Sequence, residues 1–126
     1  KVVHLDENAP HLTQADKELI HNIQVYIENN IDNADITIDD VARALYMGRS
    51  RFNKKIKQLF GLTPLNFIKT MRIQRAHQLL LCGEYNVSEV AFRTGFNDPK
   101  YFTRCFKRYY GTTPLDLQSG RKTTED

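Results

Sequence analysis

The chain has 126 residues, of which 40% are hydrophobic and 26% charged, which suits one or two small globular domains rather than a disordered chain. It holds no apolar run of roughly 20 residues and no basic-then-apolar leader, so we expect no membrane segment in it. Residues 1–36 have a net charge of −5 and the remaining residues +8, within a total of +3. An acidic segment therefore precedes a basic body, unless the difference is only an uneven surface.

The first residues of the chain have the composition of a linker. Residues 1–15 mix charged and small residues with one proline, and the chain begins with Lys1 rather than methionine. We therefore expect a fragment, joined through this linker to an upstream domain that it lacks. An amphipathic helix is predicted after Thr13, with Asp16 in its first turn, because apolar residues recur every three or four positions. These apolar positions are Leu19, Ile20, Ile23, Ile27 and Ile31.

Two short helices separated by a short turn are predicted next. Thr37 with Asp40 three residues later is the pattern of a capping box, which indicates that a helix begins there. The turn is expected at residues 46–48. A second helix from about Arg49 to Phe60 should end at Gly61, because a glycine readily takes the left-handed conformation that closes a helix.

A longer helix is predicted to connect this pair to a second one. Thr63 is a good N-cap and Pro64 suits the first helical position, where its missing N–H costs nothing, so the connecting helix should occupy residues 63–83. The same organisation then recurs over residues 84–118. A polar tail is expected at residues 119–126.

An internal repeat is the strongest pattern in the sequence. Val41-Ala42 matches Val90-Ala91 at an offset of 49 residues, and six further positions match at an offset of 50. These six are Phe52, Lys57, Gly61, Thr63, Pro64 and Leu65, which match Phe102, Lys107, Gly111, Thr113, Pro114 and Leu115. Two copies of one small unit are indicated, too few for a solenoid. The sequence thus predicts an all-α fold of about seven helices, with helix-turn-helix subdomains at residues 16–62 and 84–118.

The outer faces of the two second helices favour a nucleic-acid partner. In a helix-turn-helix, the second helix lies in the major groove of DNA. The side chains spaced i, i+3, i+4, i+7 on these helices are Ser50, Asn53, Lys54 and Lys57, then Lys100, Thr103, Arg104 and Lys107. Cations neutralise phosphates, Asn pairs with adenine, and Arg or Lys pairs with guanine. The alternative is a plain helical hairpin with a solvated basic face, although such helices normally include acids for i,i+4 pairing.

The stretch from Val90 to Pro114 resembles the signature of the AraC/XylS family of bacterial transcription regulators. The resemblance covers about residues 17–117. It includes Thr63-Pro64 and a connecting helix similar to the family's, with Arg72, Ala76, Leu79 and Leu80. It implies a monomeric unit whose two recognition helices bind double-stranded DNA in successive major grooves. One departure is Leu117-Gln118, where family members usually have an aromatic and then a basic residue.

The resemblance also assigns roles to individual residues. The base-reading positions are Ser50, Asn53, Lys54, Pro99, Lys100, Thr103 and Arg104. Pro99 has no donor, so only apolar contact with a thymine methyl is expected there. Phosphate contacts are expected, from their charge rather than from the resemblance, at Arg49, Arg51, Lys57, Lys107 and Arg108. Asp98 is expected to cap its helix rather than to contact phosphate.

The function expected for the whole protein is regulation of bacterial transcription. RNA polymerase is a further partner that the resemblance implies. The upstream domain is expected to be the sensing part of a hybrid two-component regulator, or alternatively a sugar- or other ligand-binding domain.

Catalysis is not expected of this fragment. No Gly-rich phosphate loop, metal-ligand cluster or nucleophile motif appears in the sequence, so no cofactor or metal is predicted, although the full-length protein could include a kinase. Cys82 and Cys105 lack metal-type spacing, and two free thiols fit a reducing cytoplasm. The competing functions are an enzyme and a protein-interaction bundle, and a bundle should bind no DNA.

Overall fold

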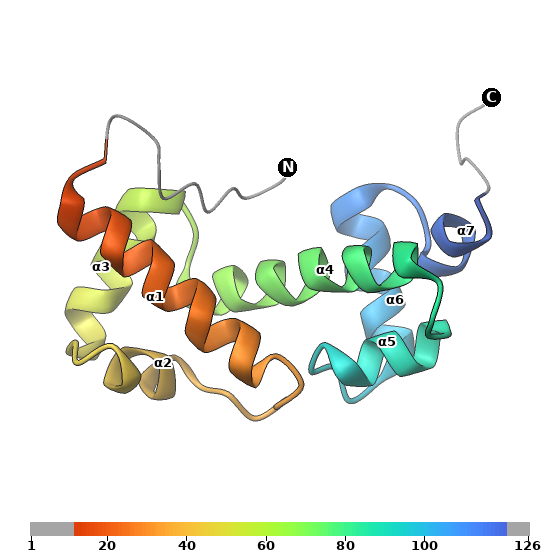
Figure 1. Ribbon diagram of the computed structural model, residues 1–126, viewed down its shortest axis with the longest axis horizontal. Helices are drawn as coiled ribbons and strands as arrows, with labels where there is room; N and C mark the ends of the chain where they lie inside the picture. Colours follow the sequence, from red (N-terminus) through yellow and green to blue (C-terminus); the bar gives the residue numbers. More distant parts are fainter. Residues whose placement is uncertain (1–11, 121–126) are drawn as a thin grey trace. The chain divides into compact units, whose positions relative to one another are not determined.

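The computed structural model describes residues 12–120, which form seven helices and, within that range, no strand (Figure 1). The helices are α1 (Gln14–Asn30), α2 (Ile38–Ala44), α3 (Arg49–Phe60), α4 (Pro64–Cys82), α5 (Val87–Arg93), α6 (Pro99–Tyr110) and α7 (Pro114–Ser119). The predicted all-α fold is confirmed. Most of the predicted linker and tail, at residues 1–11 and 121–126, lies outside the described residues. None of the helices in the described range is long and apolar enough to cross a membrane.

The described chain forms two compact units. The N-terminal unit consists of residues 12–30 and 35–69, and the C-terminal unit consists of Ile31–Ala34 and residues 70–120. Helix α4 begins in the first unit and ends in the second. The short segment Ile31–Ala34 thus belongs to the C-terminal unit, although the residues on both sides of it belong to the other.

Matching capping boxes begin the first helix of each helix-turn-helix. The Asp40 amide donates to Thr37 Oγ1 at 3.1 Å, and the Thr37 amide donates to Asp40 Oδ2 at 3.0 Å. The same two bonds join Asn86 and Glu89, each at 2.8 Å. Each box satisfies two backbone N–H groups that a helix start leaves unpaired. The box at Thr37 confirms the prediction, and the box at Asn86 was not predicted.

Glycines end both second helices. Gly61 and Gly111 have φ values of 70° and 79°, and their amides donate to the carbonyls of Lys57 and Lys107 at 2.8 and 2.7 Å. These left-handed C-caps confirm the predicted ends of α3 and α6.

The interior of the N-terminal unit is aliphatic, with aromatic residues contributed by α3 and α4. Its buried apolar residues are Ile20, Ile23, Ile27, Val41, Ala42, Phe52, Ile56, Phe67 and Ile68. The Phe60 and Phe67 rings stack with centroids 4.9 Å apart. Asp16, itself buried, pairs with Lys55 Nζ at 2.8 Å and joins α1 to α3. The Lys55 hydrogen bond holds the pKa of the Asp16 carboxyl below its ordinary value.

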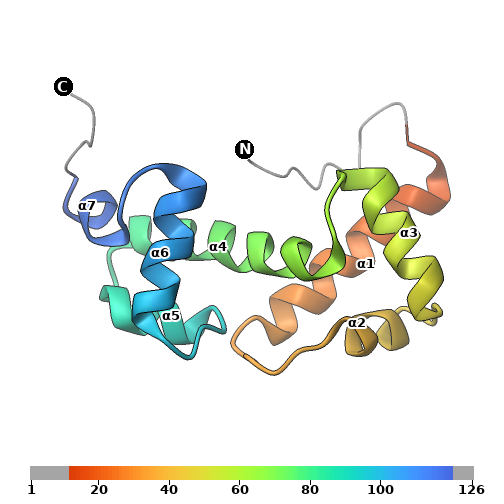
Figure 2. The same cartoon turned by 180° about the vertical axis from the view of Figure 1, so that it is seen from behind.

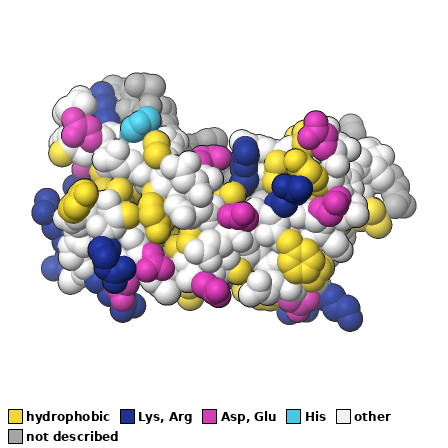
Figure 3. Space-filling view, turned by 60° about the horizontal axis from the view of Figure 1, so that its bottom comes forward, with side chains coloured by type: hydrophobic (Ala, Val, Ile, Leu, Met, Phe, Trp, Pro, Cys, Tyr) yellow, Lys and Arg dark blue, Asp and Glu magenta, His cyan; other side chains and the backbone are white. Residues whose placement is uncertain are grey.

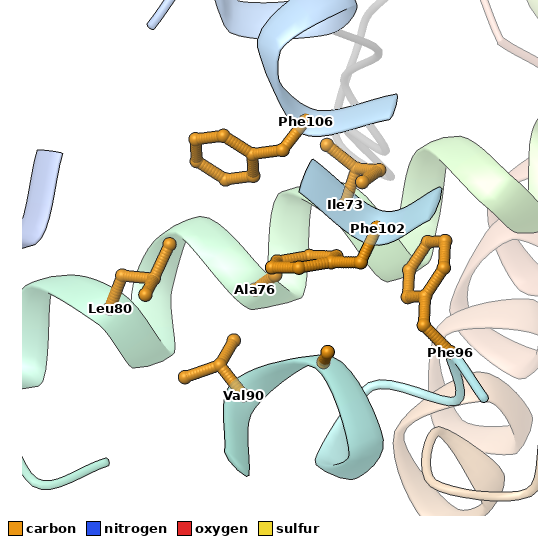
Figure 4. Close-up of a cluster of buried hydrophobic side chains, with 8 residues drawn as sticks. Ile73, Ala76, Leu80, Val90, Phe96, Phe102 and Phe106 are labelled. Carbon is orange, nitrogen blue, oxygen red and sulfur yellow. The ribbon is translucent and has the colours of Figure 1, made fainter. Parts of the chain in front are cut away.

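The interior of the C-terminal unit is dominated by phenylalanine rings (Figure 4). Phe102 lies between α4 and α5, with its ring centroid 5.1 Å from Phe96 and 5.8 Å from Phe106. The remaining members of this cluster are Ile73, Ala76, Leu80, Val90 and Ala91. Since Phe102 and Phe106 are fully buried, the opposite side of α6 is turned outward.

Arg72 brings a charge into this unit. The residue is 6% exposed. Its guanidinium donates from Nη1 to the carbonyls of Ile31, at 2.6 Å, and Thr94, at 3.0 Å, and from Nη2 to the carbonyl of Asn33, at 2.8 Å. We call this arrangement the Arg72 clamp. Burial lowers the pKa of the guanidinium below its ordinary value. The clamp fastens Ile31–Ala34 to the turn between α5 and α6.

Candidate nucleic-acid interface

The two helix pairs share one turn geometry. The amide of Met47 donates to the carbonyl of Ala42 at 2.9 Å, and the amide of Phe96 donates to the carbonyl of Ala91 at the same distance. Both bonds link the turn to the helix before it, at positions 49 residues apart. The sequence repeat is therefore also a repeat of backbone structure, typical of a helix-turn-helix.

One turn position differs sharply between the copies. Tyr46 and Gly95, again 49 residues apart, both have positive φ, at 58° and 89°. A Cβ at Gly95 would lie 1.5 Å from Nη1 of Arg72, so only glycine fits there. Tyr46 is 97% exposed and meets no such neighbour, but it bears the backbone strain of a left-handed residue that is not glycine.

Helix α3 presents the predicted polar face. Phe52 and Ile56 are buried, and Ser50, Lys54 and Lys57 are exposed (Figure 2 shows α3 from behind the view of Figure 1). Asn53 differs from a freely presented base reader. It is half-buried, and its Oδ1 atom is buried with no hydrogen-bond partner among the described residues. Its amide would have to turn outward to meet a base.

The start of α3 is open to an anion. Its N-cap, Gly48, makes no side-chain cap bond, and its first turn holds no acid. Arg49 and Arg51 are both exposed at this end. Arg49 Nε lies 3.5 Å from Asp39 Oδ1, which offsets part of its charge. Because unpaired N–H groups at a helix start favour anions, this end suits a phosphate.

Helix α6, whose ribbon Figure 2 shows, carries the second predicted face. Its exposed cations are Lys100, Arg104, Lys107 and Arg108, while Pro99 and Thr103 are half-buried. Asp98 accepts a hydrogen bond from the Lys100 amide at 2.9 Å, which confirms that it caps the helix.

Tyr101 is a residue of this face that the sequence prediction did not include. The residue is 43% exposed, and the Arg104 guanidinium carbon lies 5.6 Å from the centroid of its ring. The centroid of the Phe96 ring lies 6.2 Å from that of Tyr101. A signal was available in the sequence, because an aromatic residue and an arginine three positions apart on a helix are neighbours.

A histidine on α4 packs against aromatic rings of α6. The His77 ring is 4.5 Å from Tyr110 and 6.2 Å from Phe106, centroid to centroid. Burial lowers the pKa of His77 below its ordinary value and raises the pKa of Tyr110 to about 12. Both groups are therefore uncharged at neutral pH and serve packing. In the described range no group of three or more His, Cys, Asp or Glu side chains is placed to hold a metal.

Two pairs of helices that share one turn geometry place the chain in the helix-turn-helix class. The family described as "Helix-turn-helix domain" matches residues 41–120. The chain belongs to the AraC family of helix-turn-helix regulators, as the sequence resemblance predicted.

Individual relatives agree. Histidine kinase P4 of Formosa agariphila is 31% identical over 119 residues, which are 89% of this chain and 9% of that protein. The DNA-binding domain of AdpA, a global transcriptional factor solved in complex with a target DNA, has a TM-score of 0.69 and 27% identity, covering 79% of this chain and 89% of that one. A probable AraC family transcriptional regulator from Rhodopseudomonas palustris has a TM-score of 0.66 and 28% identity, covering 83% and 99%. The chain thus spans a small part of the kinase that it matches.

Proposed function

We propose that this chain binds double-stranded DNA sequence-specifically and regulates bacterial transcription, with α3 and α6 as the recognition helices. One observation carries the proposal: both second helices of the repeat combine cations with short polar side chains and hold no acid. The first helix of each pair differs, because it contains acids: Asp39 and Asp40 in α2, and Glu89 in α5. In the view of Figure 3, acidic, basic and apolar side chains are mixed together on the surface that faces the reader.

The polar faces divide into two roles under this proposal. The base-reading side chains are Ser50, Asn53, Lys54, Lys100, Thr103 and Arg104, with Pro99 limited to apolar contact. Phosphate contacts come from Arg49, Arg51, Lys57, Lys107 and Arg108, together with the open start of α3. Phosphate contacts fix the register of a helix in the groove, and base contacts select the sequence.

The larger protein is proposed to be a sensor that uses this chain as its output domain. The match to a histidine kinase over 9% of that protein's length supports a hybrid two-component regulator. RNA polymerase is the further partner proposed for transcription control. A protein that binds the bacterial chromosome acts in the cytoplasm.

The decisive experiment selects bound sequences from a random DNA pool and then measures the affinity of variants for the selected site and for random DNA. Arg104→Ala should cost about 1–3 kcal/mol on the selected site and relax preference at one base pair. Lys57→Ala should weaken both DNAs about equally, because a phosphate contact carries no base information.

Two results would count against this function. Equal losses for Arg104→Ala on selected and random DNA would remove base readout from that residue. An absence of any enriched sequence, with no mobility shift at low salt, would favour the protein-interaction bundle instead.

A further inference from the structure

We propose that Tyr101 is a positioning residue, which holds the guanidinium of Arg104 in place for base reading by α6. This inference rests on the proposed DNA-binding function. It gives the second recognition helix a device that the first one lacks.

The geometry forms a continuous support from the core to the surface. Phe96 is buried and packs on Phe102 at 5.1 Å between centroids. The Tyr101 ring lies 6.2 Å from Phe96, and the Arg104 guanidinium carbon lies 5.6 Å from the centre of the Tyr101 ring. From Tyr101 through Phe96 to Phe102, each residue therefore lies next to one that is more deeply buried.

The contact matters because arginine is flexible. A guanidinium within about 6 Å of an aromatic ring centre is attracted by the ring's electron density. A free arginine side chain loses rotamer entropy when it is fixed on a base. A side chain that is already restrained loses less, so more of the contact energy remains for discriminating the correct base. The ion pairs among residues 12–120 involve Arg43, Arg49 and Lys55, so none of them competes with the Tyr101 ring for Arg104.

The first copy supplies an internal contrast. At the positions 50 residues earlier, Arg51 replaces Tyr101 and Lys54 replaces Arg104. Met47 occupies the turn position of Phe96, as their matching backbone bonds show. Helix α3 therefore has neither the ring nor the planar cation. We expect the base pair that Arg104 contacts to be specified more strictly than the one that Lys54 contacts.

The test measures affinities of the 126-residue chain for its selected site and for versions with each base pair changed. Tyr101→Leu should reduce discrimination at the Arg104 base pair about two- to fivefold and leave the other positions unchanged. Tyr101→Phe keeps the ring and should stay within about twofold of the parent. In an Arg104→Ala background, Tyr101→Leu should cause no further loss at that base pair. Tyr101→Gln gives the same comparison if the leucine variant does not fold.

The contrary outcomes separate the alternatives. An equal loss on all sites for Tyr101→Leu would make Tyr101 a general phosphate or packing residue. An equal loss for Tyr101→Phe would assign the effect to the hydroxyl, and a loss that persists without Arg104 would also overturn the proposal. If Arg104→Ala alone leaves base preference unchanged, the proposed reading role of Arg104 fails, and the positioning role fails with it. Enrichment of a sequence and salt-dependent binding would still stand in that case.

Discussion

At the scale of single residues, Arg72 and Gly95 form a matched pair. The Arg72 guanidinium donates hydrogen bonds to three backbone carbonyls. One of its nitrogens occupies the space that a side chain on residue 95 would need. Hydrogen bonds to a charged group are worth more than neutral ones, and a buried charge that loses them is costly. A single methyl group can therefore disturb the whole clamp.

Gly95→Ala should lower the free energy of unfolding by about 3 kcal/mol or more, because Arg72 must move and lose carbonyl partners. Gly61→Ala is the matched control, since Gly61 also has positive φ but open space around its Cβ position. The control should cost only the left-handed backbone strain, about 1–2 kcal/mol. Urea unfolding followed by circular dichroism measures both. Similar losses in the two variants would argue that the clamp tolerates displacement.

At the scale of helices, the contact between α4 and α6 depends on an uncharged His77. Burial lowers its folded pKa below the unfolded value of 6.5, so the unfolded chain binds more protons as the solution becomes acidic. The stability contributed by neutral His77 is thus complete above about pH 6.5 and is lost as pH falls through the folded pKa.

His77→Phe should therefore flatten the decline in stability below about pH 6.5. The measurement is thermal or urea unfolding across pH 5 to 8, where the carboxyl groups contribute least. An unchanged slope for His77→Phe would show that the imidazole is accommodated in both charge states.

Helix boundaries were largely predictable from the sequence, because they depend on short-range chemistry. Thr37 with Asp40, Asp98 before Pro99, and the glycines after α3 and α6 all act within one turn of a helix. The second capping box, at Asn86, escaped prediction although the same rule covers it.

The fine structure of the interface was less predictable, because it depends on residues far apart in sequence. The Arg72 clamp binds main-chain carbonyls, which every residue has, so the amino-acid types at positions 31 and 33 do not reveal it. The half-buried state of Asn53 likewise depends on tertiary packing, which its helical spacing does not reveal. Family resemblance supplied the candidate readers but not the support that Tyr101 gives to Arg104.

At the scale of the whole molecule, the total charge of +3 understates the attraction to DNA, because the first 36 residues carry −5 and the remainder +8. The dependence of the binding constant on salt reports the number of phosphates that the protein neutralises, rather than the total charge of the protein. With five phosphate contacts, the slope of log K against log salt should be about −4 to −5.

Lys57→Ala should make that slope less steep by about 1, since one phosphate contact is removed. Lys17→Ala, which removes the same charge from α1, should leave the slope unchanged. Fluorescence anisotropy at several salt concentrations gives both values. If the two variants shifted the slope equally, net charge rather than the α3 face would govern binding.

The discontinuity of the C-terminal unit restricts how this domain can be recombined. Ile31–Ala34 is separated by 35 residues from the rest of its unit, and the Arg72 clamp binds it there. In a chimera that took only residues 84–118 from a relative, the turn between α5 and α6 would come from the relative. Arg72 and the carbonyls of Ile31 and Asn33 would still come from this chain. The repeat visible in the sequence is thus not a transplantable module. The exchangeable set is the second helix pair together with residue 72 and the segment after α1.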